Sequence, residues 1–240
     1  MGAEREAPKG PRGLPPYDPA PDPHARARAF LRWGLAGLIV LAPLPFGSVQ
    51  PLPVLLIELV AAVLGAVGVW ILVRERPSFP PRVKIAFWAV AGIVALGVLQ
   101  AVPLPAGVVR VLAPPVAEAR EAVAAVLPEL RMTWFPLSLS PADTWDAVAR
   151  FVAYALIGVA TLAAVRRSRD FLFLGMAFAA AGVFQATYGA AEFLSGRQQI
   201  FGYVKKYYLE SATGTFINRN HYASMLAMCA PFALGCAAAW

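Results

Sequence analysis

Charged residues are scarce in this sequence. Of its 240 residues, 15% are charged and 59% are hydrophobic, whereas soluble domains usually carry about 25% charged residues. Several uncharged apolar stretches also reach the roughly 20 residues that a helix needs to cross the hydrocarbon core of a bilayer. This balance argues against a soluble globular domain and indicates a protein embedded in a membrane.

Cysteine is nearly absent as well. The two cysteines, Cys229 and Cys236, both lie in the last apolar run. Their spacing is typical neither of a disulfide framework nor of a zinc site. We expect small buried thiols, and no metal site is indicated.

The continuous apolar stretches predict about six transmembrane helices. In lipid, every backbone N–H and C=O must be paired within a helix or a closed barrel, and these runs do not alternate as barrel strands do. The sequence therefore predicts an all-α, polytopic integral membrane protein, with a helical domain over residues 29–240. The expected spans are residues 29–46, 52–73, 85–102, 147–165, 171–194 and 221–240.

The segments outside these spans are of two kinds. Residues 1–28 are rich in proline and charge, a composition that cannot bury a core and predicts a disordered tail. Within residues 106–130, apolar residues recur at helical spacing beside charged ones. We expect an amphipathic helix there, either lying on the outer membrane interface or packed on the other helices. Its apolar residues are Val116, Ala119, Val123, Val126 and Leu127.

Basic residues set the expected orientation. Short connections rich in Lys and Arg stay in the cytoplasm, and the tail and the connections after the second and fourth spans are of this kind. The N-terminus is therefore expected inside and residues 195–220 outside. These inward segments explain most of the net charge of +7, so we do not expect nucleic-acid binding. The outward segment is an exception that needs a reason, because it also carries Arg197, Lys205, Lys206 and Arg219.

The stretch GTFINRNHYASML, residues 214–226, supplies a candidate reason. Asn218 or Asn220 is a suitable N-cap for the last span, and the free N–H groups of that helix end are partly positive. With Arg219 and His221 beside it, this end is suited to bind phosphate or diphosphate. The basic residues Lys205 and Lys206 are added to this candidate site. The alternative is that these residues only cap the helix and anchor it at the interface.

Two glutamates inside predicted spans are further candidates. Glu58 lies about six residues into the second span, and Glu192 lies near the outer end of the fifth, with Gln185 about two turns deeper on a similar face. An ionisable group within a span is by default a functional-site hypothesis. The structural alternatives are an ion pair of Glu58 with a basic residue of the outer connection, and simple solvation of Glu192 at the interface.

Several motifs, taken in order, resemble bacterial O-antigen ligase-like membrane proteins. The stretch ATGTFINRNHYASML, residues 212–226, is similar to the GTFxNRNHFAxxL segment of that family. The similarity extends from Leu31 to the end of the sequence. Shorter pieces that agree are PLPFGSVQP, LQAVPLP, SLSPADTWDAVARFVAYAL and GVFQATYGAAEFLSG.

This resemblance implies a multi-pass glycosyltransferase of the bacterial inner membrane with its active face in the periplasm. Members transfer a glycan from a polyisoprenyl-diphosphate carrier to lipid A core, another glycan or protein, as ligases or polymerases. The carrier is an activated donor, so no nucleotide sugar, metal or other cofactor is implied. The site must neutralise the departing diphosphate and position the acceptor. Arg219 and His221 are the catalytic residues this implies, with Asn218 and Asn220 shaping the turn.

One departure from the family leaves other classes open. Members usually continue through more spans and a large periplasmic loop, whereas this sequence stops at Trp240 within an apolar run. We therefore expect the N-terminal portion of a longer protein, or a truncated and inactive product. A non-catalytic membrane assembly or lipid-binding subunit would use the same basic segment to hold anionic lipids. A transporter is disfavoured because no internal repeat with paired interrupted helices is evident.

The orientation is testable by cysteine labelling. In a chain whose Cys229 and Cys236 are replaced by serine, Arg219→Cys should react with a membrane-impermeant maleimide from the periplasmic side. Arg166→Cys, in the basic connection after the fourth span, is the control and should react only after permeabilisation. Labelling of position 219 from the cytosol alone would contradict the expected topology.

Overall fold

The computed structural model describes residues 22–130 and 132–238, and within them the chain is almost entirely helical. Five helices of this part are long and apolar enough to cross a membrane, which confirms the prediction of an all-α, multi-pass membrane protein. They are α2 (Pro51–Glu75), α3 (Pro81–Ala101), α6 (Pro141–Ala164), α7 (Ser168–Leu194) and α8 (Arg219–Ala238).

The first predicted span differs from the others. Helix α1 (Ala25–Leu41) has 17 residues, about 26 Å at 1.5 Å per residue, and stops before Pro43 and Pro45, which cannot donate backbone hydrogen bonds. At its other end it includes residues 25–28, which the sequence places in the disordered tail. Residues 1–21 of that expected tail lie outside the described residues.

The remaining elements are short. Between α3 and α6 lie β1 (Leu104–Pro105), α4 (Ala106–Leu112), α5 (Pro114–Val126), the 3-10 turn η2 (Pro128–Leu130) and β2 (Trp134–Phe135). The segment expected to hold one amphipathic helix thus holds α4 and α5. Strands β1 and β2 pair antiparallel, as do β3 (Gln199–Ile200) and β4 (Tyr203–Val204) between α7 and α8. The 3-10 turn η1 (Phe46–Ser48) precedes α2.

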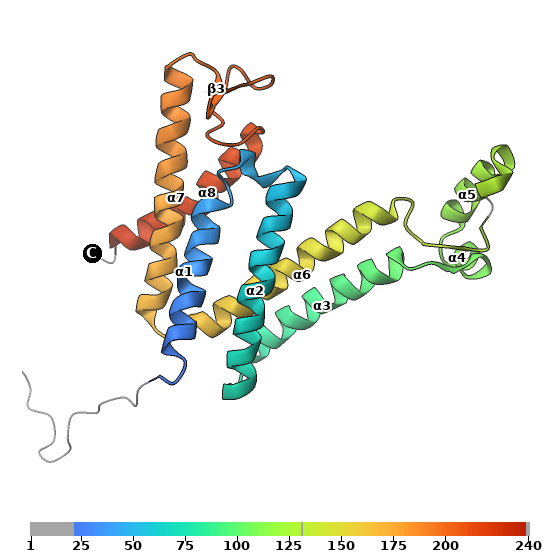
Figure 1. Ribbon diagram of the computed structural model, residues 1–240, viewed down its shortest axis with the longest axis horizontal. Helices are drawn as coiled ribbons and strands as arrows, with labels where there is room; N and C mark the ends of the chain where they lie inside the picture. Colours follow the sequence, from blue (N-terminus) through green and yellow to red (C-terminus); the bar gives the residue numbers. More distant parts are fainter. Residues whose placement is uncertain (1–21, 131, 239–240) are drawn as a thin grey trace, which may run out of the picture.

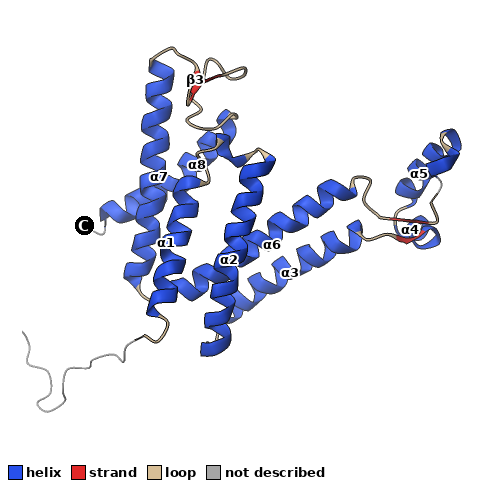
Figure 2. Cartoon of the chain, in the orientation of Figure 1, coloured by secondary structure: helices blue, strands red, loops and turns tan. Residues whose placement is uncertain are grey.

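The long helices form two groups (Figure 1). Helices α1, α2 and α7 run side by side, and α8 crosses α7 obliquely. Helices α3 and α6 pack on each other and lean away from this group, with α4 and α5 at their far end (Figure 2). The connection that contains β3 and β4 lies at the same end of the bundle as the turn between α1 and α2.

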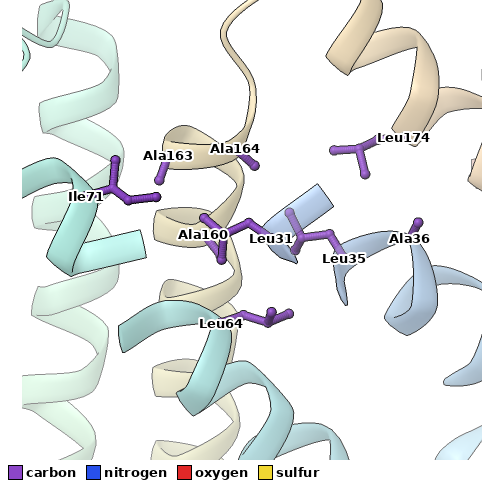
Figure 3. Close-up of a cluster of buried hydrophobic side chains, with 9 residues drawn as sticks. All are labelled: Leu31, Leu35, Ala36, Leu64, Ile71, Ala160, Ala163, Ala164 and Leu174. Carbon is purple, nitrogen blue, oxygen red and sulfur yellow. The ribbon is translucent and has the colours of Figure 1, made fainter. Parts of the chain in front are cut away.

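The core where the two groups meet is built from small and branched apolar residues (Figure 3). In a membrane, burial of apolar residues does not drive helices together, because lipid tails are as apolar as the protein. Helix association therefore depends on close packing, which small side chains allow. A Cβ on Gly68 of α2 would lie 2.9 Å from the Cα of Ala160 in α6, so only glycine allows this approach. The buried cluster comprises Leu31, Leu35, Ala36, Leu64, Ile71, Ala160, Ala163, Ala164 and Leu174.

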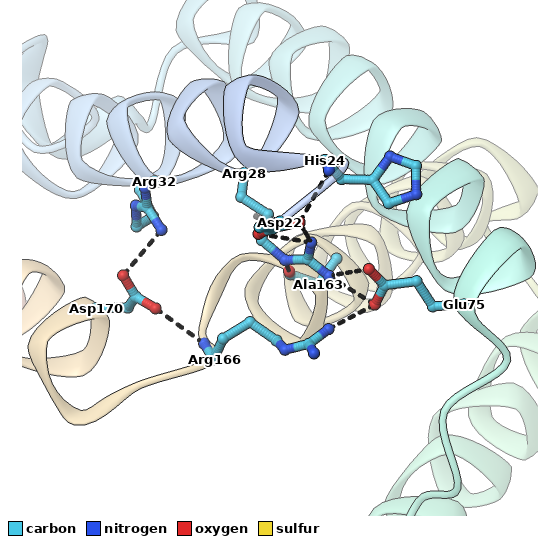
Figure 4. A network of polar contacts seen from close by, with 8 residues as sticks. All are labelled: Asp22, His24, Arg28, Arg32, Glu75, Ala163, Arg166 and Asp170. Carbon is cyan, nitrogen blue, oxygen red and sulfur yellow. Dashed lines mark hydrogen bonds and ion pairs between the residues drawn. The ribbon is translucent and has the colours of Figure 1, made fainter. Parts of the chain in front are cut away.

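A network of charged residues closes the end of the bundle opposite to β3 (Figure 4). Arg28 of α1 is only 1% exposed. Its guanidinium donates to both carboxylate oxygens of Glu75 at 2.6 Å, to Asp22 at 2.9 and 3.1 Å, and to the carbonyl of Ala163 at 3.0 Å. Glu75 also accepts a hydrogen bond from Arg166 at 2.6 Å. One buried arginine therefore joins α1, α2 and the end of α6.

A second pair extends the network to α7. Arg32 donates to Asp170 at 2.8 Å, and the other Asp170 oxygen accepts the backbone N–H groups of Arg166 and Arg167, both at 3.0 Å. At the edge of the network, the pKa of Asp22 lies below its usual value. Burial alone would raise this pKa, but the hydrogen bond from the backbone N–H of His24 and the positive charge of Arg28 together outweigh burial.

Removing the central arginine should destabilise the bundle. Arg28→Ala leaves the carboxylates of Glu75 and Asp22 without their shared arginine partner. Because Glu75 keeps Arg166, we expect the free energy of unfolding to fall by about 3 kcal/mol, which is near the lower end of the range for a broken buried ion pair. The measurement is thermal unfolding in detergent. Arg26→Ala is the matched control, because Arg26 is exposed on the same helix. Equal melting temperatures for both variants would show that the network contributes nothing to stability.

Candidate functional site

The N-terminus of α8 is capped by Asn218. Its side-chain oxygen accepts a hydrogen bond from the backbone N–H of Asn220 at 2.8 Å, and its carbonyl accepts one from the N–H of Tyr222 at 3.1 Å. Of the two asparagines considered for this cap, Asn218 therefore holds the N-cap position and Asn220 lies within the first turn.

A fully buried threonine fixes the segment that leads into α8. Thr215 Oγ1 accepts a hydrogen bond from Nε2 of Gln185 at 2.7 Å and donates to the carbonyl of Pro43 at 2.7 Å. The N–H of Thr215 donates to Oε1 of Gln185 at 3.1 Å. Gln185 belongs to α7 and Pro43 to the turn between α1 and α2, so three distant segments meet at one side chain.

Two glycines make room for this arrangement. Gly214 has a φ of 54°, and a Cβ there would lie 2.6 Å from Oε1 of Gln185 and 2.6 Å from the ring of Tyr222. Gly47, with a φ of 71°, leaves the space that the buried ring of Phe216 occupies. Residues with a Cβ rarely adopt such φ values, so both positions require glycine for backbone and packing reasons together.

The other polar residues of the motif are exposed in the first turn of α8. They are Arg219, Asn220 and His221. The Arg219 guanidinium lies 5.4 Å from the centroid of the Tyr208 ring and makes a long contact of 3.5 Å with Ser211 Oγ. Neither contact neutralises its charge. The motif thus divides into residues that build the turn and, in the first turn of α8, three exposed polar residues that a ligand can reach.

Lys205 and Glu192 form a buried ion pair. Lys205 Nζ lies 3.3 Å from Glu192 Oε1 and donates to the carbonyl of Ser211 at 3.0 Å. The two side chains are 2% and 4% exposed. Glu192 is therefore not simply solvated at the interface. The charge of Lys205 is neutralised within the protein and is not available to a ligand. The tight turn at Phe201 and Gly202, with φ values of 48° and 86°, reverses the chain between β3 and β4, and the N–H of Lys205 then donates to the carbonyl of Gln198 at 2.8 Å.

The last two candidates lie apart from this pair. Lys206 is exposed next to buried Lys205. Glu58 is half-buried on α2, and within the described residues no ion pair or side-chain hydrogen bond involves it. The ion pair between an outer basic residue and a glutamate within a span, considered for Glu58, forms instead at Glu192.

Sequence reasoning noted Gln185 only as a polar residue within a span and missed Thr215 and Phe216. The glutamine is a usable signal, since a buried amide in a membrane helix needs hydrogen-bond partners. Nothing in the sequence identifies the partner, because Thr215 lies 30 residues beyond Gln185, and the second partner of Thr215, the Pro43 carbonyl, lies 172 residues away.

The described residues show neither a metal cluster nor a link between the cavity around α4 and α5 and this helix end. In residues 22–130 and 132–238, no group of three or more His, Cys, Asp or Glu residues is placed to hold a metal ion. A cavity of about 900 Å³ lies instead among α4, α5 and β2. Its lining includes Arg110, Arg120, Val123, Met132, Phe135 and Leu139.

The geometry defines a multi-pass helical membrane protein with an exposed, positively charged helix tip. No family model, curated protein or solved structure matches the chain. The assignment of a function therefore depends on the residues of the tip and on the motif resemblance.

Two neighbouring buried threonines offer a matched test of the tip. Thr213 and Thr215 are both fully buried, but within the described residues Thr213 Oγ1 has no hydrogen-bond partner. Thr215→Val should lower the free energy of unfolding by about 1–3 kcal/mol, because it strands the amide of Gln185 and the carbonyl of Pro43. Thr213→Val should leave the free energy of unfolding unchanged or raise it slightly, because it removes a buried hydroxyl that has no partner. Melting temperatures in detergent measure both, and an equal effect of the two variants would contradict the role of Thr215.

Proposed function

We propose that this chain belongs to a membrane glycosyltransferase of the O-antigen ligase or polymerase type. It transfers a glycan from a polyisoprenyl-diphosphate carrier to lipid A core, another glycan or protein, on the periplasmic face of the bacterial inner membrane. The observation that carries the proposal is the exposed turn of Arg219, Asn220 and His221 on a rigid buried framework.

The helix tip has the properties of a diphosphate site. The backbone N–H groups of Arg219 and His221 have no hydrogen-bond partner within the described part of the chain. Free N–H groups at the positive end of a helix attract anions. The Arg219 guanidinium adds a planar fork that two phosphate oxygens can share, and it can leave the Tyr208 ring without breaking an ion pair. Exposed Lys206 adds positive potential, whereas paired Lys205 does not.

The reaction asks little more of the protein. A hydroxyl oxygen of the acceptor attacks the anomeric carbon of the glycan, the bond from that carbon to the diphosphate oxygen breaks, and the diphosphate leaves on its lipid. Arg219 and the helix N–H groups stabilise the negative charge that develops on the leaving group. His221, in the same turn, is positioned to accept the hydroxyl proton or to donate a hydrogen bond to the diphosphate.

Substitution at the tip tests this proposal. In the full-length protein in proteoliposomes, with a polyisoprenyl-diphosphate-linked oligosaccharide as donor, Arg219→Ala and His221→Ala should each lower glycan transfer about 100-fold or more, as expected for removal of a group that stabilises transition-state charge. Membrane insertion and melting temperature should stay close to those of the unmodified protein.

Arg197→Ala is the matched control. Arg197 is exposed in the same connection, so the variant loses the same charge without touching the helix tip, and it should retain transfer activity. Full activity of Arg219→Ala would exclude the assigned site. Donor binding without any product from the unmodified protein would favour the other class, a non-catalytic lipid-binding or assembly subunit.

A further inference from the structure

The segment from β1 to β2, residues 104–135, forms a small lobe at the far end of α3 and α6 (Figures 1 and 2). We refer to it as the α4–α5 lobe. Its own core consists of Val109, Ala117 and Phe135. Its main contacts are internal, between α4 and α5, between α4 and the two strands, and between α5 and η2. The rest of the described chain therefore does not cover its outer faces.

Each helix of the lobe exposes apolar residues on one face. On α4 they are Val108, Val111 and Leu112, and on the last turn of α5 they are Val123 and Val126, with exposed Leu127 directly after the helix. Within each helix the spacing i, i+3 places these residues on a single face. Val111 and Val126 are each 79% exposed. Of the apolar stripe found in the sequence, Val123, Val126 and Leu127 are exposed, whereas Val116 packs against the core of the lobe, where Ala117 is buried.

The polar residues lie on the opposite side of each helix. Arg110 of α4 and Glu121 of α5 form an ion pair with Nε 2.8 Å from Oε1. At 100° per residue, Arg110 lies opposite the apolar face of α4, and Glu121 lies opposite that of α5. The two helices pack on each other through Val109 and Ala117, and the exposed ion pair lies on the side of each helix that is opposite to its exposed apolar residues.

The membrane lies within reach of these faces. Val102 and Pro103 alone separate α3 from β1, and residues 136–140 separate β2 from α6. Five extended residues span at most about 18 Å, so both connections keep the lobe close to the bilayer edge. Trp134 and Trp145, both exposed on the side of α6 where the lobe begins, are of the type that gathers at membrane–water interfaces.

We propose that the α4–α5 lobe is a membrane-interface anchor, with the apolar faces of α4 and α5 inserted among the lipid acyl chains and the Arg110–Glu121 pair at headgroup level. This proposal concerns the lobe alone and does not depend on the proposed glycosyl transfer. We expect lipid to cover these apolar faces, because both connections of the lobe lead directly to membrane-spanning helices, α3 and α6, which lipid surrounds. An amphipathic helix with this division of residues is stable in the plane of such an interface.

Depth-dependent quenching tests the anchor. In full-length protein with Cys229→Ala and Cys236→Ala, the variants Val111→Cys and Val126→Cys are labelled with an environment-sensitive NBD dye and reconstituted in nanodiscs. Their emission should shift to the blue, lose intensity with lipids that carry a doxyl group high on the acyl chain, and resist aqueous iodide. Glu118→Cys, exposed on the polar face of α5, is the matched control and should lose intensity with iodide instead.

Other occupants give different results. Strong iodide quenching at positions 111 and 126, equal to that at 118, would place the lobe in water and overturn the proposal. Protection from both iodide and doxyl lipids would also overturn it, because a second copy or another protein segment would then cover these faces. Leu112→Cys repeats the test at a position outside the lobe's core, so a folding defect of one labelled variant does not decide the outcome.

Discussion

The hydroxyl of Thr215 is the contact on which the end of the bundle at the N-terminus of α8 depends. A polar side chain without water must find its partners inside the protein, and Thr215 satisfies the carbonyl of Pro43 and the amide of Gln185 at once. Gly214 and Gly47 then become necessary, because any Cβ would displace the groups brought together there. The first turn of α8 follows directly from this fixed segment, so its exposed residues are held in one position without making the holding contacts themselves.

The two ends of the bundle use charge in opposite ways. At one end, Arg28 is buried and bonded to the carboxylates of Glu75 in α2 and of Asp22 before α1, and to a carbonyl of α6, so its charge is neutralised where helices meet. At the other end, Glu192 neutralises the charge of Lys205 in the same way, whereas the guanidinium of Arg219 lies over the ring of Tyr208. An arginine held in this manner stays positioned and still carries its full charge, which is what an anion site requires.

Much of the architecture could be predicted from the sequence because membrane-length apolar runs have few alternatives. The all-α class and the approximate places of α2, α3, α6, α7 and α8 follow from hydrophobicity alone. The preference for asparagine at helix N-caps predicts Asn218 or Asn220 as the cap of α8, and the structure selects Asn218. The sequence could not predict which polar groups pair, since those choices depend on tertiary contacts. Glu192 rather than Glu58 pairs with Lys205, and Arg28, expected in a disordered tail, is among the most buried residues.

The Thr215 contact also has a consequence for biogenesis. Membrane helices enter the bilayer in the order of synthesis, and the Thr215 partners belong to segments made well before it, one of them 172 residues earlier. Until α8 emerges from the ribosome and the translocon, the amide of Gln185 and the carbonyl of Pro43 lack their final ligand. The tip is thus completed only when α8 arrives, and a chain that ends before α8 leaves these two polar groups without their Thr215 partner.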